Sequence, residues 1–246
     1  MVAAEAALAL ADLPDEPGVL LTSVRRLIDF HPSCGPLWWV AAHVLVADDP
    51  VLAADLVVDQ LDDDPTADRL GEALRSFKGG RQIVVAFEAT DQVARGIGGV
   101  QSCAVRVVGE LPALRRAVAA MGSYVEDVTG WPTSEISAAL DEARVVLIEA
   151  SAAGPAGIVA PAGARSLAED AVRSGVLVWG VAGVGRTLPS RMFDALVARV
   201  EATGEVELVP AEFLALMIGP DGAARPAAAL ASTDCPAPPE LFRRAV

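Results

Sequence analysis

The sequence predicts an α/β protein in two parts: a small acidic helical N-terminal domain, residues 1–78, followed by a Rossmann-like domain, residues 79–246. The second part is expected to hold a mainly parallel β-sheet with helices on both faces. Two observations predict this class. Up to residue 75, apolar residues recur at helical spacing, and after the turn at 78–80 short β-branched runs alternate with helical segments. Such alternation is typical of βαβ units in a parallel sheet.

The N-terminal domain is expected to contain helices at residues 23–30, 37–46, 50–61 and 67–77. The third helix has the clearest period of 3.6 residues, with apolar side chains at Val51, Leu52, Leu56, Val57 and Leu61. An acidic run, Asp62 to Asp64, ends it before Pro65 and is more typical of a solvated loop than of a metal site. Asp64 or Thr66 is the expected N-cap of the next helix.

The second domain is expected to contain strands at residues 82–87, 104–108, 124–128, 144–150 and 176–181, with helices at 90–96, 111–121, 134–142 and 166–174. The strand at 144–150 (RVVLIEA) is almost entirely apolar, which is typical of a central strand buried on both faces. The Pro-rich tail at 234–239 is expected to be an extended arm that packs on a neighbour or on the edge of the sheet.

Charge and composition exclude several classes of function. The chain has a net charge of −14, and residues 1–75 carry 14 acidic against 4 basic side chains. Such a surface repels phosphate backbones, so we expect no direct nucleic-acid binding. No apolar stretch approaches the ~20 residues of a membrane span. The N-terminus also lacks the basic region of a signal peptide, so we expect no membrane partner and a cytoplasmic location.

The cysteines are expected to be free, buried thiols. Cys34, Cys103 and Cys235 are widely spaced, and only His31 and His43 accompany them as nitrogen ligands. A zinc site needs about four such ligands at characteristic spacing. We therefore expect no metal and no cofactor.

Ligands of a parallel sheet bind beyond the carboxyl ends of its strands. That rule selects the loops at residues 88–91, 109–112, 151–165 and 182–188. The longest loop, 151–165, is rich in Gly and Ala and leads into a helix, whose N-terminus favours an anion. Ser151, Gly157 and Arg165 are its candidate ligand-binding residues, and a plain Gly/Ala-rich crossover is an equally good interpretation. It is not a P-loop, because GxxxxGK(S/T) is absent.

Three further charged residues lie at or just after the ends of strands. Arg186, after the strand at 176–181, is a candidate ligand for a phosphate. Glu88 follows the first strand and Glu149 ends the central one, and two carboxylates at strand ends can act as acid and base. Glu88 is the better catalytic candidate because it lies beyond its strand, whereas Glu149 is equally interpretable as a satisfied polar group within the sheet.

Four segments, in order, resemble one known family. Residues 31–39 (HPSCGPLWW) are similar to its RPTxxNLxWA helix start, and residues 144–168 match the rhythm of its D-x-VLVGADAV segment. Residues 175–186 resemble HGVPVYVxAxxxK, and residues 209–214 (VPAEFL) resemble VPPELI. This family joins the alpha, beta and delta subunits of translation initiation factor 2B to methylthioribose-1-phosphate isomerase and ribose-1,5-bisphosphate isomerase.

The resemblance implies a helical N-terminal domain, a Rossmann-like C-terminal domain that mediates dimerisation, and a sugar-phosphate or nucleotide pocket at the strand ends. The isomerases of the family use a Cys after the first strand and an Asp after the central one. Here those positions fall on Phe87 or Glu88 and on Ser151. The resemblance implies other polar positions as well. Of these, only the Lys that ends the HGVPVYVxAxxxK segment has a charged counterpart in this sequence, Arg186. Losing acid/base groups removes roughly 10²–10⁴ in rate, which weighs against isomerase chemistry.

We therefore expect a dimeric, non-isomerase binding or regulatory protein that takes a small phosphorylated ligand through Ser151, Gly157, Arg165 and Arg186. One alternative is a sugar-phosphate aldose–ketose isomerase with Glu88 as base. The other is a structural module whose acidic N-terminal domain docks a basic surface of a protein partner. A polar, arginine-lined crevice favours the first two, and a crevice filled with apolar side chains favours the third.

Overall fold

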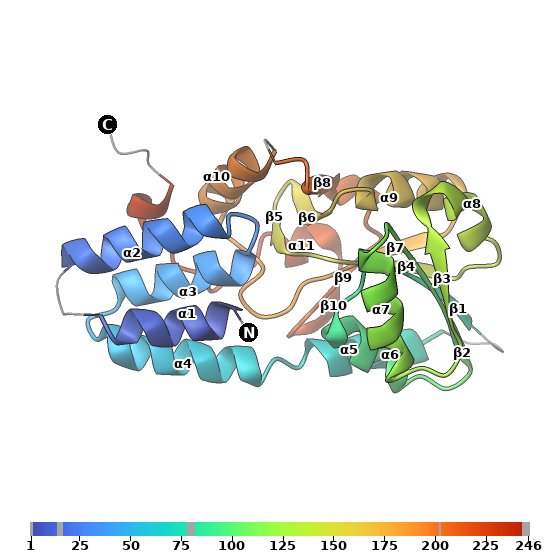
Figure 1. The fold of residues 1–246 in the computed structure, drawn as a ribbon, viewed down its shortest axis with the longest axis horizontal. Coiled ribbons are helices and arrows are strands. Elements are labelled where there is room, and N and C mark those ends of the chain that lie inside the picture. Colours follow the sequence, from blue (N-terminus) through green and yellow to red (C-terminus); the bar gives the residue numbers. More distant parts are fainter. Residues whose placement is uncertain (1, 14–16, 78–81, 202, 243–246) are drawn as a thin grey trace.

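The structure is a computed structural model that describes residues 2–13, 17–77, 82–201 and 203–242. Figure 1 shows its two parts side by side, a group of helices and a sheet flanked by helices. No helix in these ranges is long and apolar enough to cross a membrane.

The helical unit is formed by α1 (Val2–Ala11), α2 (Pro17–Phe30), α3 (Gly35–Val46) and α4 (Pro50–Asp62). Helix α3 is its centre, because eight of its residues are buried, among them Trp38 and Trp39 at 0% exposure. The expected helices at 23–30, 37–46 and 50–61 are confirmed. Asp49 caps α4, because its Oδ1 accepts hydrogen bonds from Val51 N at 3.1 Å and Leu52 N at 3.0 Å.

Among the described residues, seven strands form one sheet in the order β10-β9-β7-β4-β1-β2-β3. Their bounds are Gln82–Phe87 (β1), Cys103–Gly109 (β2), Val128–Pro132 (β3), Val145–Glu149 (β4), Leu177–Val181 (β7), Leu216–Gly219 (β9) and Gly222–Ala224 (β10). All neighbours pair in parallel except β10 and β9. The expected mainly parallel sheet is thus confirmed, with β4 at its centre.

Helices cover both faces of this sheet. Successive residues of a strand point to opposite faces, so Val84 packs with α5 (Thr66–Arg75), α6 (Asp91–Gly98) and α7 (Ala113–Gly122). Val85 packs instead with α8 (Ile136–Ala139) and α9 (Ala164–Arg173) on the other face. This arrangement confirms the Rossmann-like class.

Two expected elements were placed wrongly. The strand expected at 124–128 starts at Val128 instead, because the residues before Val128 lead the chain back from α7. Tyr124 is 40% exposed, and its Oη donates a hydrogen bond to Asp91 at 2.8 Å. The helix expected at 134–142 is only a 3₁₀ turn, Thr133–Glu135, followed by the short α8. No side chain caps the start of either piece.

The expected loop at 151–165 is a hairpin of β5 (Ala152–Gly154) and β6 (Gly157–Pro161), which pairs with β8 (Val206–Pro210) in a second sheet. Small residues serve close packing in this hairpin. At Gly154 a Cβ atom would lie 2.4 Å from the Phe193 ring, and at Gly157, where φ is +146°, it would lie 2.1 Å from Val209 O.

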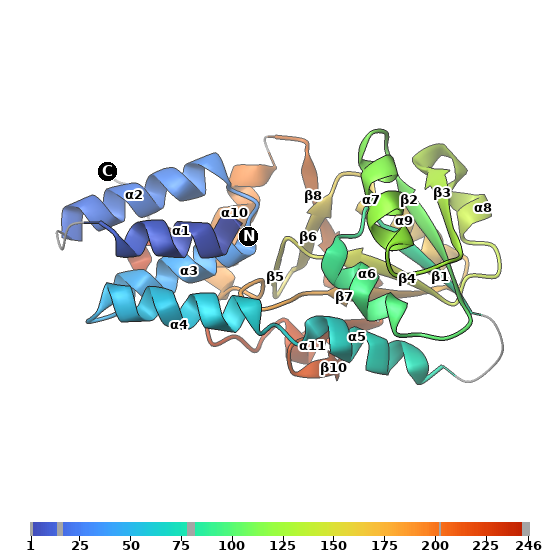
Figure 2. The ribbon, with the colours of Figure 1, turned by 60° about the horizontal axis from the view of Figure 1, so that its bottom comes forward.

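Contacts cross the expected domain boundary at residue 78 in both directions. Helix α5 precedes that boundary but lies against α6, β9 and β10, as Figure 2 shows. Helix α10 (Ser190–Val200) follows it but packs on the helical unit, where Met192, Phe193 and Leu196 are fully buried. The end of the first domain at residue 78 stays a prediction.

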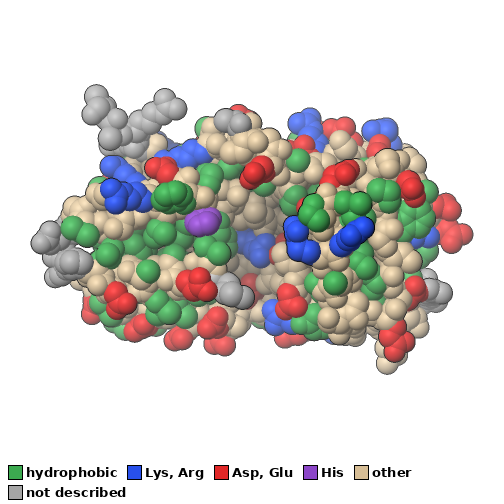
Figure 3. Space-filling view, viewed as in Figure 1, with side chains coloured by type: hydrophobic (Ala, Val, Ile, Leu, Met, Phe, Trp, Pro, Cys, Tyr) green, Lys and Arg blue, Asp and Glu red, His purple; other side chains and the backbone are tan. Residues whose placement is uncertain are grey.

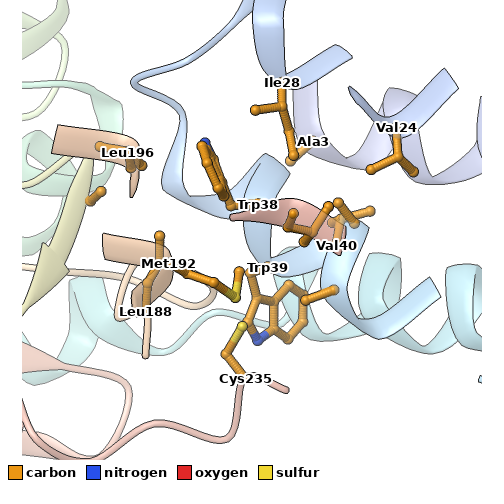
Figure 4. Packing of buried hydrophobic residues seen from close by; sticks show 14 of the residues in the cluster. Ala3, Val24, Ile28, Trp38, Trp39, Val40, Leu188, Met192, Leu196 and Cys235 are labelled. Atoms are coloured by element: carbon orange, nitrogen blue, oxygen red, sulfur yellow. The ribbon is translucent and has the colours of Figure 1, made fainter. Parts of the chain in front are cut away.

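The C-terminal tail packs on the helical unit of its own chain, so the expected packing on the sheet edge is corrected, and packing on a neighbour stays a prediction. Cys235 and Leu241 join the core around Trp39, and Figure 4 shows Cys235 next to Trp39. The Trp39 Nε1 also donates to Asp234 Oδ1 at 3.3 Å, and Arg25 donates to the Glu240 carbonyl at 3.1 Å. Apolar burial and these bonds hold the tail at the helices.

Candidate functional site

The topological switch point of the sheet lies between β1 and β4. From β1 the chain continues outward through β2 and β3, whereas from β4 it continues the other way through β7 and β9. Parallel sheets bind ligands at the carboxyl ends of the two strands that flank such a point. Here those ends are Phe87 of β1 and Glu149 of β4.

The crevice at the switch point is occupied by a network of Glu149, Thr90 and Arg186, called here the switch-point network. Glu149 is buried, and its Oε2 accepts a hydrogen bond from Thr90 N at 3.0 Å. The Thr90 hydroxyl donates to both carboxylate oxygens, at 2.7 and 2.6 Å. Arg186 Nη2 lies 2.8 Å from Glu149 Oε1, and its Nη1 donates to the Ala150 carbonyl. The partly buried guanidinium and the buried carboxylate therefore compensate each other.

Helix α3 closes the crevice from the side of the helical unit. Gly35 N donates to the Ser151 carbonyl at 2.9 Å, and a Cβ atom at Gly35 would lie only 2.6 Å from that oxygen. The Ser151 hydroxyl donates to the Val159 carbonyl at 3.1 Å, so it is held within the hairpin. The start of α3 and the strand ends thus meet without room for a larger residue.

None of the three cysteines is arranged as a nucleophile. All three thiols are free, as expected. Cys235 is buried, but Cys34 and Cys103 are only partly buried, so the burial expected of these two was wrong. Burial raises the pKa of Cys34, although the Leu37 N–H and the charge of Arg186 counteract this. Burial also raises the pKa of Cys103 to about 11 and that of Cys235 to about 12. A thiol nucleophile needs a lowered pKa instead.

Asp64 joins the helical unit to the loop after β7, a role that the sequence did not indicate. Its Oδ1 accepts from Thr66 N at 2.9 Å, but the N-cap of α5 is Pro65, so the expectation that Asp64 or Thr66 is the N-cap was wrong. Its Oδ2 accepts from Gln92 Nε2 at 2.6 Å and from Val184 N at 3.0 Å. A Cβ atom at Gly183 would lie 2.3 Å from that oxygen, so the contact depends on glycine.

The helix N-terminus expected to bind an anion already holds a carboxylate of the protein. Glu207 of β8 accepts through Oε1 from Gly163 N at 2.7 Å and from Arg165 N at 2.8 Å, at the start of α9. The Arg165 guanidinium pairs with Glu169 at 3.0 Å along the helix. Arg165 and Arg186 therefore have separate partners, and the ligand roles assigned to Ser151, Gly157, Arg165 and Arg186 stay predictions.

Glu88 lies outside the switch-point network, in a small cavity between β1 and α7. Its φ of +39° is in the left-handed region, and its Oε1 accepts from Glu110 N at 3.1 Å. The cavity has a volume of about 290 Å³ and is lined by Glu88, Thr90, Arg116 and alanines. A carboxylate and a guanidinium thus share one cavity at the strand ends, and Arg116 was not among the residues that the sequence singled out.

A larger cavity, of about 850 Å³, lies at the carboxyl ends of β7 and β9. Its walls come from the end of α4, the loop after β7, the β9–β10 turn and residues 228–234 at the start of the tail. Its charged lining residues are Asp63, Asp221 and Asp234, and none of the described residues that line it is a lysine or arginine. Figure 3 shows the surface hollowed between the helical unit and the sheet.

No protein-family model and no curated protein matches the sequence. Solved structures do match. A translation initiation factor eIF-2B from Pyrococcus horikoshii OT3 has a TM-score of 0.74 at 14% identity, covering 93% of this chain and 90% of its own. The eIF2B beta subunit from Chaetomium thermophilum has a TM-score of 0.64 at 15% identity, covering 90% and 82%. A chain of the tetrameric beta2-delta2 complex from C. thermophilum has a TM-score of 0.63 at 16% identity, covering 93% and 86%. The chain therefore has the fold of the translation initiation factor 2B proteins, as the resemblance in its sequence predicted.

Proposed function

We propose that the chain is a binding or regulatory protein of this fold that forms a homodimer and has no isomerase activity. The switch-point network is the observation that carries this proposal. The arginine that would bind an anion at the switch point is paired with buried Glu149, and separating the two leaves an uncompensated charge in the crevice. A ligand must offset that cost before it gains any affinity.

The residues at the positions of the isomerase groups support the same conclusion. Phe87 is 1% exposed and packs in the core of one sheet face, so it presents nothing to a substrate. The Ser151 hydroxyl is bonded to the Val159 carbonyl. Neither Phe87 nor Ser151 supplies the acid or base that proton transfer requires.

One observation favours the alternative of a sugar-phosphate enzyme or sugar-phosphate-binding protein. Glu88 and Arg116 line the same cavity, and a left-handed conformation at a residue other than glycine is typical of functional sites. The volume of about 290 Å³ is at the lower end for small-ligand pockets. In this alternative Arg116 holds the phosphate and Glu88 is the base.

Turnover and association measurements test the proposed function. We expect no conversion of methylthioribose 1-phosphate or ribose 1,5-bisphosphate, and a sedimentation mass twice that of one chain. The tetrameric assembly of the eIF2B beta and delta subunits supports the expectation of self-association. Turnover that is lost in Glu88→Gln would establish the isomerase alternative, and a monomer at all concentrations would contradict the dimer.

A thermal-shift screen of sugar phosphates and nucleoside monophosphates locates any ligand. A ligand at 100 times its Kd stabilises the fold by about 2.7 kcal/mol, which is easily measured. A shift lost in Arg186→Ala places the ligand at the switch point, and one lost in Arg116→Ala places it beside Glu88. Arg115→Ala is the matched control, because Arg115 is exposed on the same helix but does not line the cavity.

A further inference from the structure

The outer face of α4 carries an apolar stripe. Leu52 and Leu56 are 56% and 53% exposed, although side chains of this size are normally turned into the core. They are four residues apart, so they lie one above the other on the helix surface. Val57 is buried, which shows that α4 does have an inward face and that these two leucines are not part of it.

An acidic stripe runs next to the apolar one. Asp55, Asp59 and Asp62 are exposed and are spaced by four and three residues, so they also lie along one line of the helix. None of the three has an ion pair within the part of the chain that the structure describes. Figure 3 shows the acidic side chains along the edge of the helical unit where α4 lies.

The apolar stripe leads into the larger cavity. Gln60 is four residues beyond Leu56 and lines that cavity of about 850 Å³, as does Asp63 at the end of the helix. Asp221 and Asp234 line it from the sheet and the tail. The end of α4 therefore borders a cavity whose charged lining is acidic, and the two exposed leucines lie farther back along the same helix.

We propose that α4 and this cavity form a docking surface for a basic amphipathic segment of a partner protein. Apolar side chains of the segment cover Leu52 and Leu56, its lysines or arginines face the acidic stripe, and one cation enters the cavity beside Asp63. Charge complementarity selects this occupant: the acidic surface repels nucleic acids and anionic membranes, and it attracts basic proteins. The inference deepens the proposed binding role by naming the chemistry of the partner.

The test measures binding of the full-length protein to a labelled helical peptide with leucines on one face and lysines on the other, by fluorescence anisotropy. A peptide of the same composition with scrambled order is the control probe. We expect the ordered peptide to bind more tightly than the scrambled one, and its affinity to fall as salt rises. Substituting Leu52→Ser with Leu56→Ser is expected to raise its Kd about tenfold.

Charge variants separate this surface from general acidity. We expect the triple variant D55N, D59N, D62N to raise the Kd of the ordered peptide about tenfold, because each exposed ion pair contributes only a modest amount. The matched control E110Q, E126Q, D141N removes the same charge from exposed residues of the other unit and is expected to change Kd by less than about twofold. Circular dichroism establishes that each variant is folded.

Three results would overturn the inference. These are equal binding of the ordered and scrambled peptides, an equal loss in both triple variants, and absence of binding by either peptide. Self-association of the free protein that the leucine substitutions abolish would assign the surface to a second copy of this chain instead. The turnover assay does not involve α4, so the inference and the proposed lack of catalysis fail on different measurements.

Discussion

Glu149, Glu207 and Asp64 show how carboxylates that join distant segments are used in this protein. Each carboxylate accepts a backbone N–H from a distant segment: Thr90 N, Gly163 N and Val184 N, respectively. Charged acceptors make stronger hydrogen bonds than neutral ones. A carboxylate in a parallel sheet is therefore open to a catalytic or a structural interpretation until its partners are known, as the sequence left it for Glu149.

The pair of Glu149 and Arg186 gives a prediction at this scale. Substituting Glu149→Gln leaves the arginine charge uncompensated, and we expect the free energy of unfolding to fall by about 3 kcal/mol. This is the low end of the range for buried pairs, because Arg186 keeps 20% of its side chain exposed. Urea unfolding measures the change.

The double variant E149Q, R186M is the control for this prediction. Removing both charges leaves nothing uncompensated, so we expect it to recover much of the lost stability. If Glu149→Gln were as stable as the natural protein, the ion pair would not hold the switch point closed.

At the scale of elements, the start of α9 shows why an anion site was expected and why the site is filled. The segment that leads into the helix is rich in small residues, and Gly163 has a φ of +99°. A helix N-terminus leaves free N–H groups that favour negative charge. Glu207 supplies that charge from β8, which pairs with β6 more than forty residues away in the sequence.

Removing this carboxylate is expected to expose the site. In Glu207→Ala the unfolding free energy should fall by about 1 kcal/mol, as for loss of an N-cap. Inorganic phosphate should then raise the melting temperature of the variant more than that of the natural protein. Glu205→Ala is the matched control, because Glu205 is exposed on the same segment. An equal response to phosphate in both variants would refute the role of Glu207.

At the scale of the whole molecule, the C-terminal part of the chain packs against the N-terminal helices. After the sheet, α10 and the tail pack on the helical unit, and Leu188, Met192 and Cys235 surround Trp39 there (Figure 4). The core of the helical unit is therefore built from both ends of the sequence. Conversely, α5 covers the sheet before the first strand is reached.

This arrangement predicts that residues 1–78 do not fold alone. The fragment lacks Phe193 and Leu196, which are fully buried against the helical unit, and it leaves the apolar face of α5 without the sheet. We expect its thermal unfolding, followed by circular dichroism, to lack a cooperative transition, in contrast to the full chain. A cooperative transition in the fragment would support the domain boundary at residue 78.

Local patterns in the sequence were sufficient for the class of fold, most helices and the central strand. Helical periodicity at 50–61 and the apolar run at 144–150 depend on each segment's own burial, which its residues express directly. The hairpin at 151–165, the packing of the tail and the partners of Glu149 and Glu207 depend instead on segments far apart in the chain. Short-range patterns do not predict such contacts, because a small or charged residue is equally compatible with a loop, with a ligand site or with close packing of two backbone segments. Tertiary packing decides between these possibilities. Gly154 leaves room for the Phe193 ring, and buried Glu149 is paired with Arg186.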